Sequence, residues 1–374
     1  MDTEPQYQLL DGSHIQLMGF TEKLSTPLSL PSPTIRVTEG DTVEIELWNM
    51  SQAAPHTIHL HGLDVDQFND GVPALSWVVE HDSKGYYNFI APHPGTYLYH
   101  CHVISPIHVQ AGMYGLFIVE SKEVGKTWQD GYKYDKEIEW LTSELDIDWH
   151  TDSMINHSYN EIGHKNLIPD YEPEYFLLNG SALSLDSVNS IPIGSDSKTY
   201  LHLANIGNYI NKISFPEQVK AELISSDGRP LPVIEITNEI FVFPGERFGV
   251  LISASDSSIE NITIDYLDMN TFKSKGLLEQ SFIFDETSQV KELSIIADLE
   301  IFPNPASDKL SISYKGELLL NYMIMDIQGR IINENILDFG LNQIEVDFLD
   351  SGVYILEINN GIKFFRQKLI IQKV

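Results

Sequence analysis

Short segments in which apolar and polar residues alternate recur along the chain, with glycine- and proline-containing turns between them. Examples are TIRVTEGDTVEIELWNM from Thr34, GYYNFIAPHPGTYLYH from Gly85 and GMYGLFIVE from Gly112. Alternation with a period of two is typical of half-buried strands, and the turn residues separate one strand from the next. Segments with helical periodicity are scarce. The pattern therefore predicts an all-β protein built from β-sandwiches.

Shifts in composition divide the 374 residues into three β-rich regions. The first, at 1–120, contains most of the histidines and the only cysteine, Cys101. A charged and aromatic connector at 121–135 leads to a second region at 136–297. The segment FPNPASDKL opens a third region, which we place at 298–374. We expect each region except the connector to form a domain with its own core.

The charge and the cysteine count restrict the possible functions. A formal net charge of -31 argues against binding to nucleic acid or to an anionic membrane surface, since both require a basic patch. We expect no transmembrane segment, because the chain has no apolar run of about 18 residues. One cysteine cannot form a disulfide within the chain. In an oxidising compartment such a thiol must be buried or bound to a metal.

Two short segments, PHTIHLHG and YLYHCHV, contain five histidines and the cysteine. Successive side chains of a strand point to opposite faces, so Cys101 is expected on the face opposite to its neighbours His100 and His102. By the same rule His59 and His61 share a face, and His56 lies on the other. One predicted site therefore contains Cys101 and His56. The other predicted site contains His59, His61, His100 and His102.

The residues after Cys101 complete the first predicted site. His108 follows seven residues later, and Met113 five residues after that. Two imidazoles, a thiolate and a weak thioether are the ligands of a blue copper centre. Zinc is a poorer interpretation, because it prefers three or four strong ligands and gains nothing from methionine. A cysteine nucleophile is poorer still, since the adjacent histidines point away from the thiol.

The third region resembles a known family. The segments IFPNPASDKLSISYKG, MIMDIQGRIINENIL, LDSGVYILEINNG and KLIIQKV resemble the C-terminal sorting domain of type IX secretion cargo from Bacteroidota-type bacteria. The resemblance implies a small immunoglobulin-like β-sandwich, the type IX secretion machinery as a partner, and a location in the medium or at the cell surface. The start, MDTEPQYQLLDGSHIQL, lacks a basic and then apolar run, so we expect the N-terminal export signal to be missing from this sequence. The alternative is an immunoglobulin-like module without a sorting role.

The first region, from about Pro33 to Glu120, resembles the copper-binding cupredoxin domain of multicopper oxidases and copper nitrite reductases. The segments that carry the resemblance are PTIRVTEGDTVEIELWN, HTIHLHGLD, DGVP, PGTYLYHCHV and GMYGLFIVE. It implies a Greek-key β-sandwich. The implied type 1 copper ligands are His56, Cys101, His108 and Met113. The histidines that match the type 2 and type 3 copper ligands are His59, His61, His100 and His102.

The second region departs from the copper-binding pattern. YFLLNGSALSL and VFPGERFGVLISA resemble the ligand-free middle cupredoxin domain of a three-domain oxidase, and the region has no His-x-His pair. A complete three-copper cluster within one chain is therefore not expected. In nitrite reductases, histidines matching His61 and His100 bind the catalytic copper, but His59 replaces the aspartate of that family. His150, His157 and His164 either reach a neighbouring subunit or form an ordinary loop.

The combined expectation is a secreted copper-dependent oxidoreductase. Electrons from a small-molecule or metal-ion donor would pass through Cys101 to the histidine-rich site, which would reduce oxygen or a related acceptor, with a possible homo-oligomer completing that site. Asp64 and Asp66 either orient a histidine or assist proton delivery, or belong to a solvated loop. A blue copper electron-transfer or copper-binding surface protein without turnover is the alternative. A third possibility is an adhesin that retains only the fold.

Overall fold

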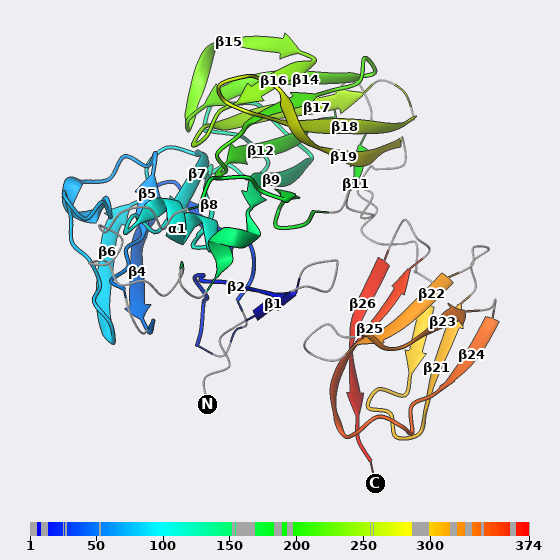
Figure 1. The fold of residues 1–374 in the computed structure, drawn as a ribbon. Helices are drawn as coiled ribbons and strands as arrows, with labels where there is room; N and C mark the ends of the chain where they lie inside the picture. Colours follow the sequence, from blue (N-terminus) through cyan, green and yellow to red (C-terminus); the bar gives the residue numbers. More distant parts are fainter. Residues whose placement is uncertain are drawn as a thin grey trace. The chain divides into compact units, whose positions relative to one another are not determined.

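The structure is a computed structural model of the whole chain, which forms two compact units, Met1–Ser288 and Gln289–Val374 (Figure 1). The structure describes residues 6–8, 14–24, 26, 28–51, 54–151, 154, 169–182, 189–192, 197–254, 256, 258–285, 299–314, 320–325, 331–337, 340–359 and 364–373. Strands dominate both units, which confirms the predicted all-β class. The predicted limits of the three domains stay a prediction.

The first half of the first unit is a sandwich of two sheets. Its four-stranded sheet has the order β3-β8-β7-β5, and its two-stranded sheet pairs β4 with β6. The strands are β3 (Ile35–Thr38), β4 (Thr42–Asn49), β5 (His59–His61), β6 (Ser83–Ile90), β7 (Gly95–His100) and β8 (Tyr114–Glu120). Alternate side chains such as Val43, Leu47, Tyr87 and Phe89 form the buried core between the sheets. Strand alternation thus produces this core as predicted.

A short helix, α1 (Ser105–Gln110), connects β7 to β8 and was not predicted from the sequence. Its entry is a left-handed residue, Ile104, with φ of 47°, followed by a proline in the first turn. Proline has a preset φ and no N–H, so it is well tolerated there. Six residues are too few for an amphipathic pattern to show in the sequence. The helix matters because it carries His108.

The second half of the first unit has two larger sheets. Their orders are β10-β9-β12-β17-β14-β15 and β11-β19-β18-β13-β16. The strands are β9 (Lys136–Leu145), β10 (Tyr175–Leu178), β11 (Asn189–Pro192), β12 (Thr199–Asn205), β13 (Ile210–Ser214), β14 (Val219–Ser226), β15 (Arg229–Thr237), β16 (Glu239–Val242), β17 (Arg247–Ala254), β18 (Ser258–Leu267) and β19 (Ser274–Asp285). This half also contains the 3-10 helix η2 (Ile147–His150), whereas the 3-10 helix η1 (Gln67–Asn69) and a hairpin of β1 (Gln6–Gln8) with β2 (His14–Gln16) lie earlier in the chain.

The two halves of the first unit pack against each other through β7. This strand contacts β12 and β17 (Figure 1). Leu98 shares a buried cluster with Leu141, Leu145 and Ala204. Thr96 Oγ1 and His202 Nδ1 are hydrogen-bonded across the same interface at 2.7 Å. Because β7 ends at His100, this packing brings the second sandwich beside the histidines of the first.

The second unit is a smaller β-sandwich with a core of its own. Its sheets have the orders β20-β21-β24 and β23-β22-β25-β26. The strands are β20 (Leu299–Phe302), β21 (Lys309–Tyr314), β22 (Leu320–Met325), β23 (Ile331–Leu337), β24 (Gly340–Glu345), β25 (Gly352–Asn359) and β26 (Phe364–Ile371). Leu310, Ile312, Ile324 and Leu356 are fully buried in its core. The predicted C-terminal β-sandwich is therefore confirmed.

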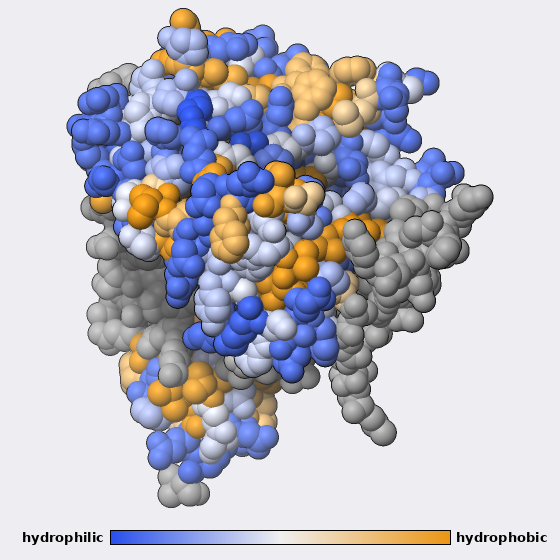
Figure 2. Space-filling model, turned by 90° about the vertical axis from the view of Figure 1, so that its left-hand side faces the viewer, coloured by the Kyte–Doolittle hydropathy of each residue, from blue (hydrophilic) through white to orange (hydrophobic). Residues whose placement is uncertain are grey.

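On the face drawn in Figure 2, hydrophilic residues surround separate hydrophobic patches. Within the described residues, no helix has the length and apolar character needed to cross a bilayer.

Candidate metal centres

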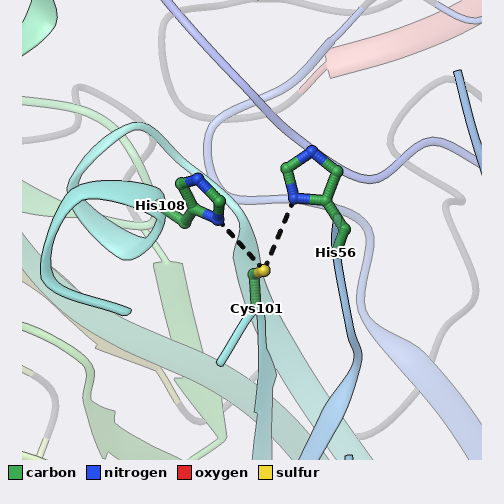
Figure 3. Close-up of side chains that lie close together, drawn as sticks. All are labelled: His56, Cys101 and His108. Atoms are coloured by element: carbon green, nitrogen blue, oxygen red, sulfur yellow. Dashed lines mark hydrogen bonds between the residues drawn. The ribbon is translucent and has the colours of Figure 1, made fainter. Parts of the chain in front are cut away.

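His56, Cys101 and His108 form one compact group. Figure 3 shows both imidazoles pointing toward the thiol, whose Sγ lies 3.6 Å from Nδ1 of His56 and 3.2 Å from Nδ1 of His108. Cys101 directly follows β7, and its backbone N–H donates to the oxygen of Met113 at 3.0 Å. His56 pairs through its backbone with Val79, just before β5. Three separate segments thus converge on one sulfur atom.

Burial sets the protonation of this group. All three side chains are at most 3% exposed. Burial lowers the pKa of His56 to about 3, with a smaller contribution from His108, and that of His108 to about 4. It also raises the pKa of the Cys101 thiol to about 11. The imidazoles are therefore neutral and able to donate lone pairs, whereas the thiolate form requires a bound cation.

Met113 lies beside the thiol, as the spacing predicts. It is buried in one cluster with Cys101 and Val103. Its backbone N–H donates to the oxygen of His108 at 3.0 Å, which links it to the end of α1. His56 is oriented by a hydrogen bond of 2.9 Å between its Nε2 and Ser51 Oγ, leaving Nδ1 to face the sulfur. This donor set of two imidazoles, a thiol and a nearby thioether is suited to copper.

A second group lies on the other face of the same strand end. His59, His61 and His100 each offer one ring nitrogen, and these three nitrogens lie within 4.8 Å of one another. His59 is directly opposite His100 in the β5–β7 pairing. Nδ1 of His61 is 3.3 Å from Nε2 of His100. Strand parity therefore separates the two groups as predicted.

His102 does not join this three-histidine group as closely as parity predicts. Its ring stacks on His100 at 5.8 Å and lies 5.2 Å from the His59 ring. However, its nitrogens are not among the three within 4.8 Å. The reason is that β7 ends at His100, so His102 lies in the turn before α1, where its N–H donates to Thr57 Oγ1.

Hydrogen bonds orient the imidazoles of the three-histidine group. Nδ1–H of His59 donates to the main-chain oxygen of Asp70 at 2.7 Å, and the Asp70 carboxylate is 3.4 Å away. Nδ1–H of His100 donates to the oxygen of Cys101 at 2.9 Å. With Nδ1 engaged in both rings, Nε2 is the nitrogen that each could offer to a metal. Sequence reasoning missed Asp70, whose only signal was its place in the DGVP segment.

Electrostatics also keep these histidines neutral. Burial lowers the pKa of His61 to about 3 and of His100 to about 4, and Arg247 contributes to the shift of His61. The pKa of His59 is lowered by burial, against the opposing effect of Asp70. Neutral imidazole is the form that binds metals.

The second sandwich covers part of the three-histidine group. Nη2 of Arg247 would lie 2.0 Å from a Cβ at Gly62, which has φ of +86°. A Cβ at Gly245 would lie 3.1 Å from the His61 ring. Close backbone approach of this kind requires glycine. Arg247, the first residue of β17, and Gly245 just before it thus lie directly against the end of β5.

Asp64 and Asp66 do not orient a histidine of this group. Asp64 is exposed and pairs with Arg229. Asp66 accepts backbone N–H groups at the start of η1. The interpretation as loop residues therefore holds for Asp66, while Asp64 links the two sandwiches.

The remaining histidines lie elsewhere. Nδ1–H of His150 donates to the oxygen of Gln16 at 2.7 Å. His202 contacts Thr96 and Glu137. His157 and His164 lie outside the described residues. In the described part of the second sandwich, no histidine belongs to either ligand group.

Comparison with known proteins identifies two parts of the chain. Residues 13–124 match the multicopper oxidase family, and residues 300–372 match the secretion system C-terminal sorting domain. Each match covers one of the regions in which the sequence resembles a known family.

Curated relatives extend the first match. The chain is 30% identical over 255 residues to an L-ascorbate oxidase of Cucurbita maxima, which covers 62% of this chain and 42% of the relative. It is 26% identical over 243 residues to an iron transport multicopper oxidase, FET3, of Candida glabrata, covering 63% and 35%. The chain thus spans less than half the length of these relatives.

Solved structures show the same fold. A blue copper oxidase from Nitrosomonas europaea is similar with a TM-score of 0.59 and 24% identity, over 76% of this chain and 84% of that chain. A copper nitrite reductase from the same organism has a TM-score of 0.57 and 19% identity, over 76% and 92%. The first unit is therefore cupredoxin-like. The chain carries a multicopper oxidase domain at residues 13–124, which implies copper as a cofactor, and a secretion system C-terminal sorting domain at residues 300–372.

Proposed function

We propose that this chain is a secreted copper-dependent oxidoreductase that takes electrons from a donor at the Cys101 group and reduces oxygen, or a related acceptor, at the histidine group. The observation that carries the proposal is the placement of two different ligand groups on opposite faces of one strand end. When bound, copper would supply one-electron redox chemistry at both groups.

His56, Cys101 and His108 would hold a type 1 copper, with Met113 as the weak ligand. Their burial excludes water from the sulfur, which protects the thiol from oxidation. The hydrogen bonds from Cys101 to Met113 and from Met113 to His108 fix these segments relative to each other before any metal binds. Such preorganisation favours a copper site whose geometry changes little on electron transfer.

His59, His61 and His100 would hold the acceptor-reducing copper, with His102 as the fourth residue of a type 2 or type 3-like site. Cys101 is bonded through the main chain to both His100 and His102. In addition, the oxygen of Cys101 accepts a hydrogen bond from the ring of His100. The chain itself thus provides a short covalent and hydrogen-bonded route between the two groups.

The donor is proposed by class only. A small organic molecule or a metal ion fits the relatives, whose names refer to ascorbate and to iron. The acidic chain would favour a cationic donor. The sorting domain supports delivery through the type IX secretion machinery to the cell surface or the medium.

The decisive experiment measures copper per chain together with visible and electron paramagnetic resonance spectra, and then oxygen consumption with a phenol or a metal-ion donor. Two or more coppers per chain, a blue absorption and donor-dependent oxygen consumption are expected. One copper with a reversible blue centre and no turnover would instead establish an electron carrier. A protein that binds no copper at the Cys101 group would contradict both functions.

A further inference from the structure

A pocket lies between the three-histidine group and the second sandwich. Its volume is about 310 Å³. His61 and His100 line one side, and Glu144, Gly207, Asn208 and Gly245 line the other. An acceptor molecule at the histidines would therefore face residues of β9 and of the loop between β12 and β13.

Glu144 is the one carboxyl among the described residues that line this pocket. It is 3% exposed, and among the described residues no cation forms an ion pair with it. Its oxygens instead accept from the N–H of Asn208 at 2.8 Å, the N–H of Tyr209 at 3.2 Å and the hydroxyl of Tyr171 at 3.1 Å. A buried carboxyl with neutral donors but no counter-ion is costly to keep ionised.

Building on the function proposed above, we propose that Glu144 holds and releases the protons consumed when the acceptor is reduced at the histidine group, and that Tyr171 and the loop at Gly207 position its carboxyl. The loop approaches so closely that a Cβ at Gly207 would lie 2.3 Å from Oε2 of Glu144. Only glycine permits this approach. The Gly207 backbone thereby packs directly against the carboxyl of a residue that lines the pocket.

The surroundings of Glu144 favour a proton that is exchanged near neutral pH. Burial raises its pKa to about 7, although the hydrogen bonds from Asn208, Tyr209 and Tyr171 act in the opposite direction. Gln110 of α1 is neutral and donates to the main-chain oxygen of Glu144. The titratable groups that face it are Tyr171, Tyr209, Tyr266 and Tyr114, with Asp146 on the same chain segment and His61 and His100 across the pocket.

The other carboxylates near the three-histidine group already have hydrogen-bond or ion-pair partners. Asp70 contacts His59, Asp66 caps η1, and Asp64 pairs with Arg229.

Complete reduction of one oxygen molecule to two waters consumes four electrons from the donor and four protons. Each proton released by Glu144 would break its O–H bond, form a new O–H bond on the reduced oxygen, and be replaced from solvent through the pocket.

The test compares Glu144→Gln with Glu139→Gln in full-length protein. Glu139 lies on the same strand but binds Thr34 and Arg36 at the surface, so its variant makes the same chemical change away from the pocket. Infrared difference titration, with and without copper, should show a carboxyl that is half protonated at about pH 7 in the wild type and in Glu139→Gln. This carboxyl signal should be missing in Glu144→Gln. This readout does not depend on turnover.

Kinetics supply the second readout. In Glu144→Gln, the rate of oxygen consumption should fall by about 100-fold. The decrease in rate at alkaline pH that the wild type shows should disappear in this variant. The rate at which the donor reduces the blue centre without oxygen should not change. An infrared midpoint or a pH profile identical to the wild type would overturn the inference. A copper-loaded wild type that consumes no oxygen would overturn the proposed function itself.

Tyr171→Phe keeps the inference testable if Glu144→Gln does not fold. In the wild type, the hydrogen bond from the Tyr171 hydroxyl lowers the pKa of Glu144. Without that hydroxyl, the infrared midpoint of the carboxyl and the pH at which the rate falls on the alkaline side should both move to higher pH. Movement of the midpoint without movement of this decrease in rate would show that Glu144 is not the proton source.

Discussion

The two ligand groups share a strand end but differ in what builds them. The Cys101 group is enclosed within one sandwich, with all three of its side chains almost fully buried. The three-histidine group opens onto a pocket whose far wall belongs to the second sandwich. The difference teaches that the fold of one sandwich suffices for the first group, whereas the second group also depends on how two sandwiches pack. Changes in the second sandwich should therefore affect only the histidine group.

The largest effect is expected from Cys101→Ser. A hydroxyl is a poor ligand for copper compared with a thiolate, so the blue absorption should disappear and donor-driven oxygen consumption should fall to background. Visible spectra and an oxygen electrode measure both. Retention of the blue colour would show that another residue supplies the strong ligand.

Replacing His61 or His100 by alanine tests whether the two faces act separately. Turnover should be lost while the blue absorption is largely kept, because neither ring contacts the Cys101 sulfur. His93→Ala is the matched control, since this exposed histidine belongs to neither group. Loss of the blue colour in both site variants would contradict the separation of the groups.

Asp70→Asn should weaken copper binding at the three-histidine group by about 10-fold. The carboxylate lies 3.4 Å from Nδ1 of His59 and strengthens the orientation of that ring. Copper titration followed by paramagnetic resonance would separate this loss from the type 1 signal. Glu80→Gln, at an exposed position of the same sandwich, is expected to behave like the wild type.

Glu144 should make the stability of the first unit depend on pH. Its folded pKa of about 7 lies above the ordinary 4.5, so the folded state keeps a proton that the unfolded state releases. The resulting stabilisation is complete below pH 4.5 and disappears as the pH rises through about 7, by up to about 3 kcal/mol. Denaturant unfolding of the wild type and Glu144→Gln across this range measures it. If the free energy of unfolding changed no more steeply with pH in the wild type than in the variant, the raised pKa would be contradicted.

The last prediction concerns the packing of the two sandwiches. Gly62→Ala should destabilise the first unit by about 2 kcal/mol more than Gly125→Ala, although both glycines have positive φ. A Cβ at Gly62 meets the Arg247 guanidinium, whereas the nearest atom to a Cβ at Gly125 is 3.4 Å away. Equal losses in denaturant unfolding would mean that Arg247 moves aside without cost.

Local patterns in the sequence were sufficient for much of this protein. Alternation with period two determined the all-β class, and the parity of PHTIHLHG and YLYHCHV placed Cys101 and its neighbours on opposite faces. The spacing from Cys101 to Met113 indicated the residues that gather around the thiol. These inferences succeed because strand geometry is repetitive, so a side chain's direction follows from its position along the chain.

Tertiary structure decided what no local pattern encodes. The end of β7 at His100 moved His102 out of the closest histidine group. Asp70 lies beside His59, Arg247 lies beside Gly62, and Glu144 lines the pocket with His61 and His100. Loops and a second sandwich that fold back onto β5 and β7 bring them there. Contacts between residues far apart in sequence depend on how whole sheets pack, and burial, which alone raises the pKa of Glu144, exists only after that packing.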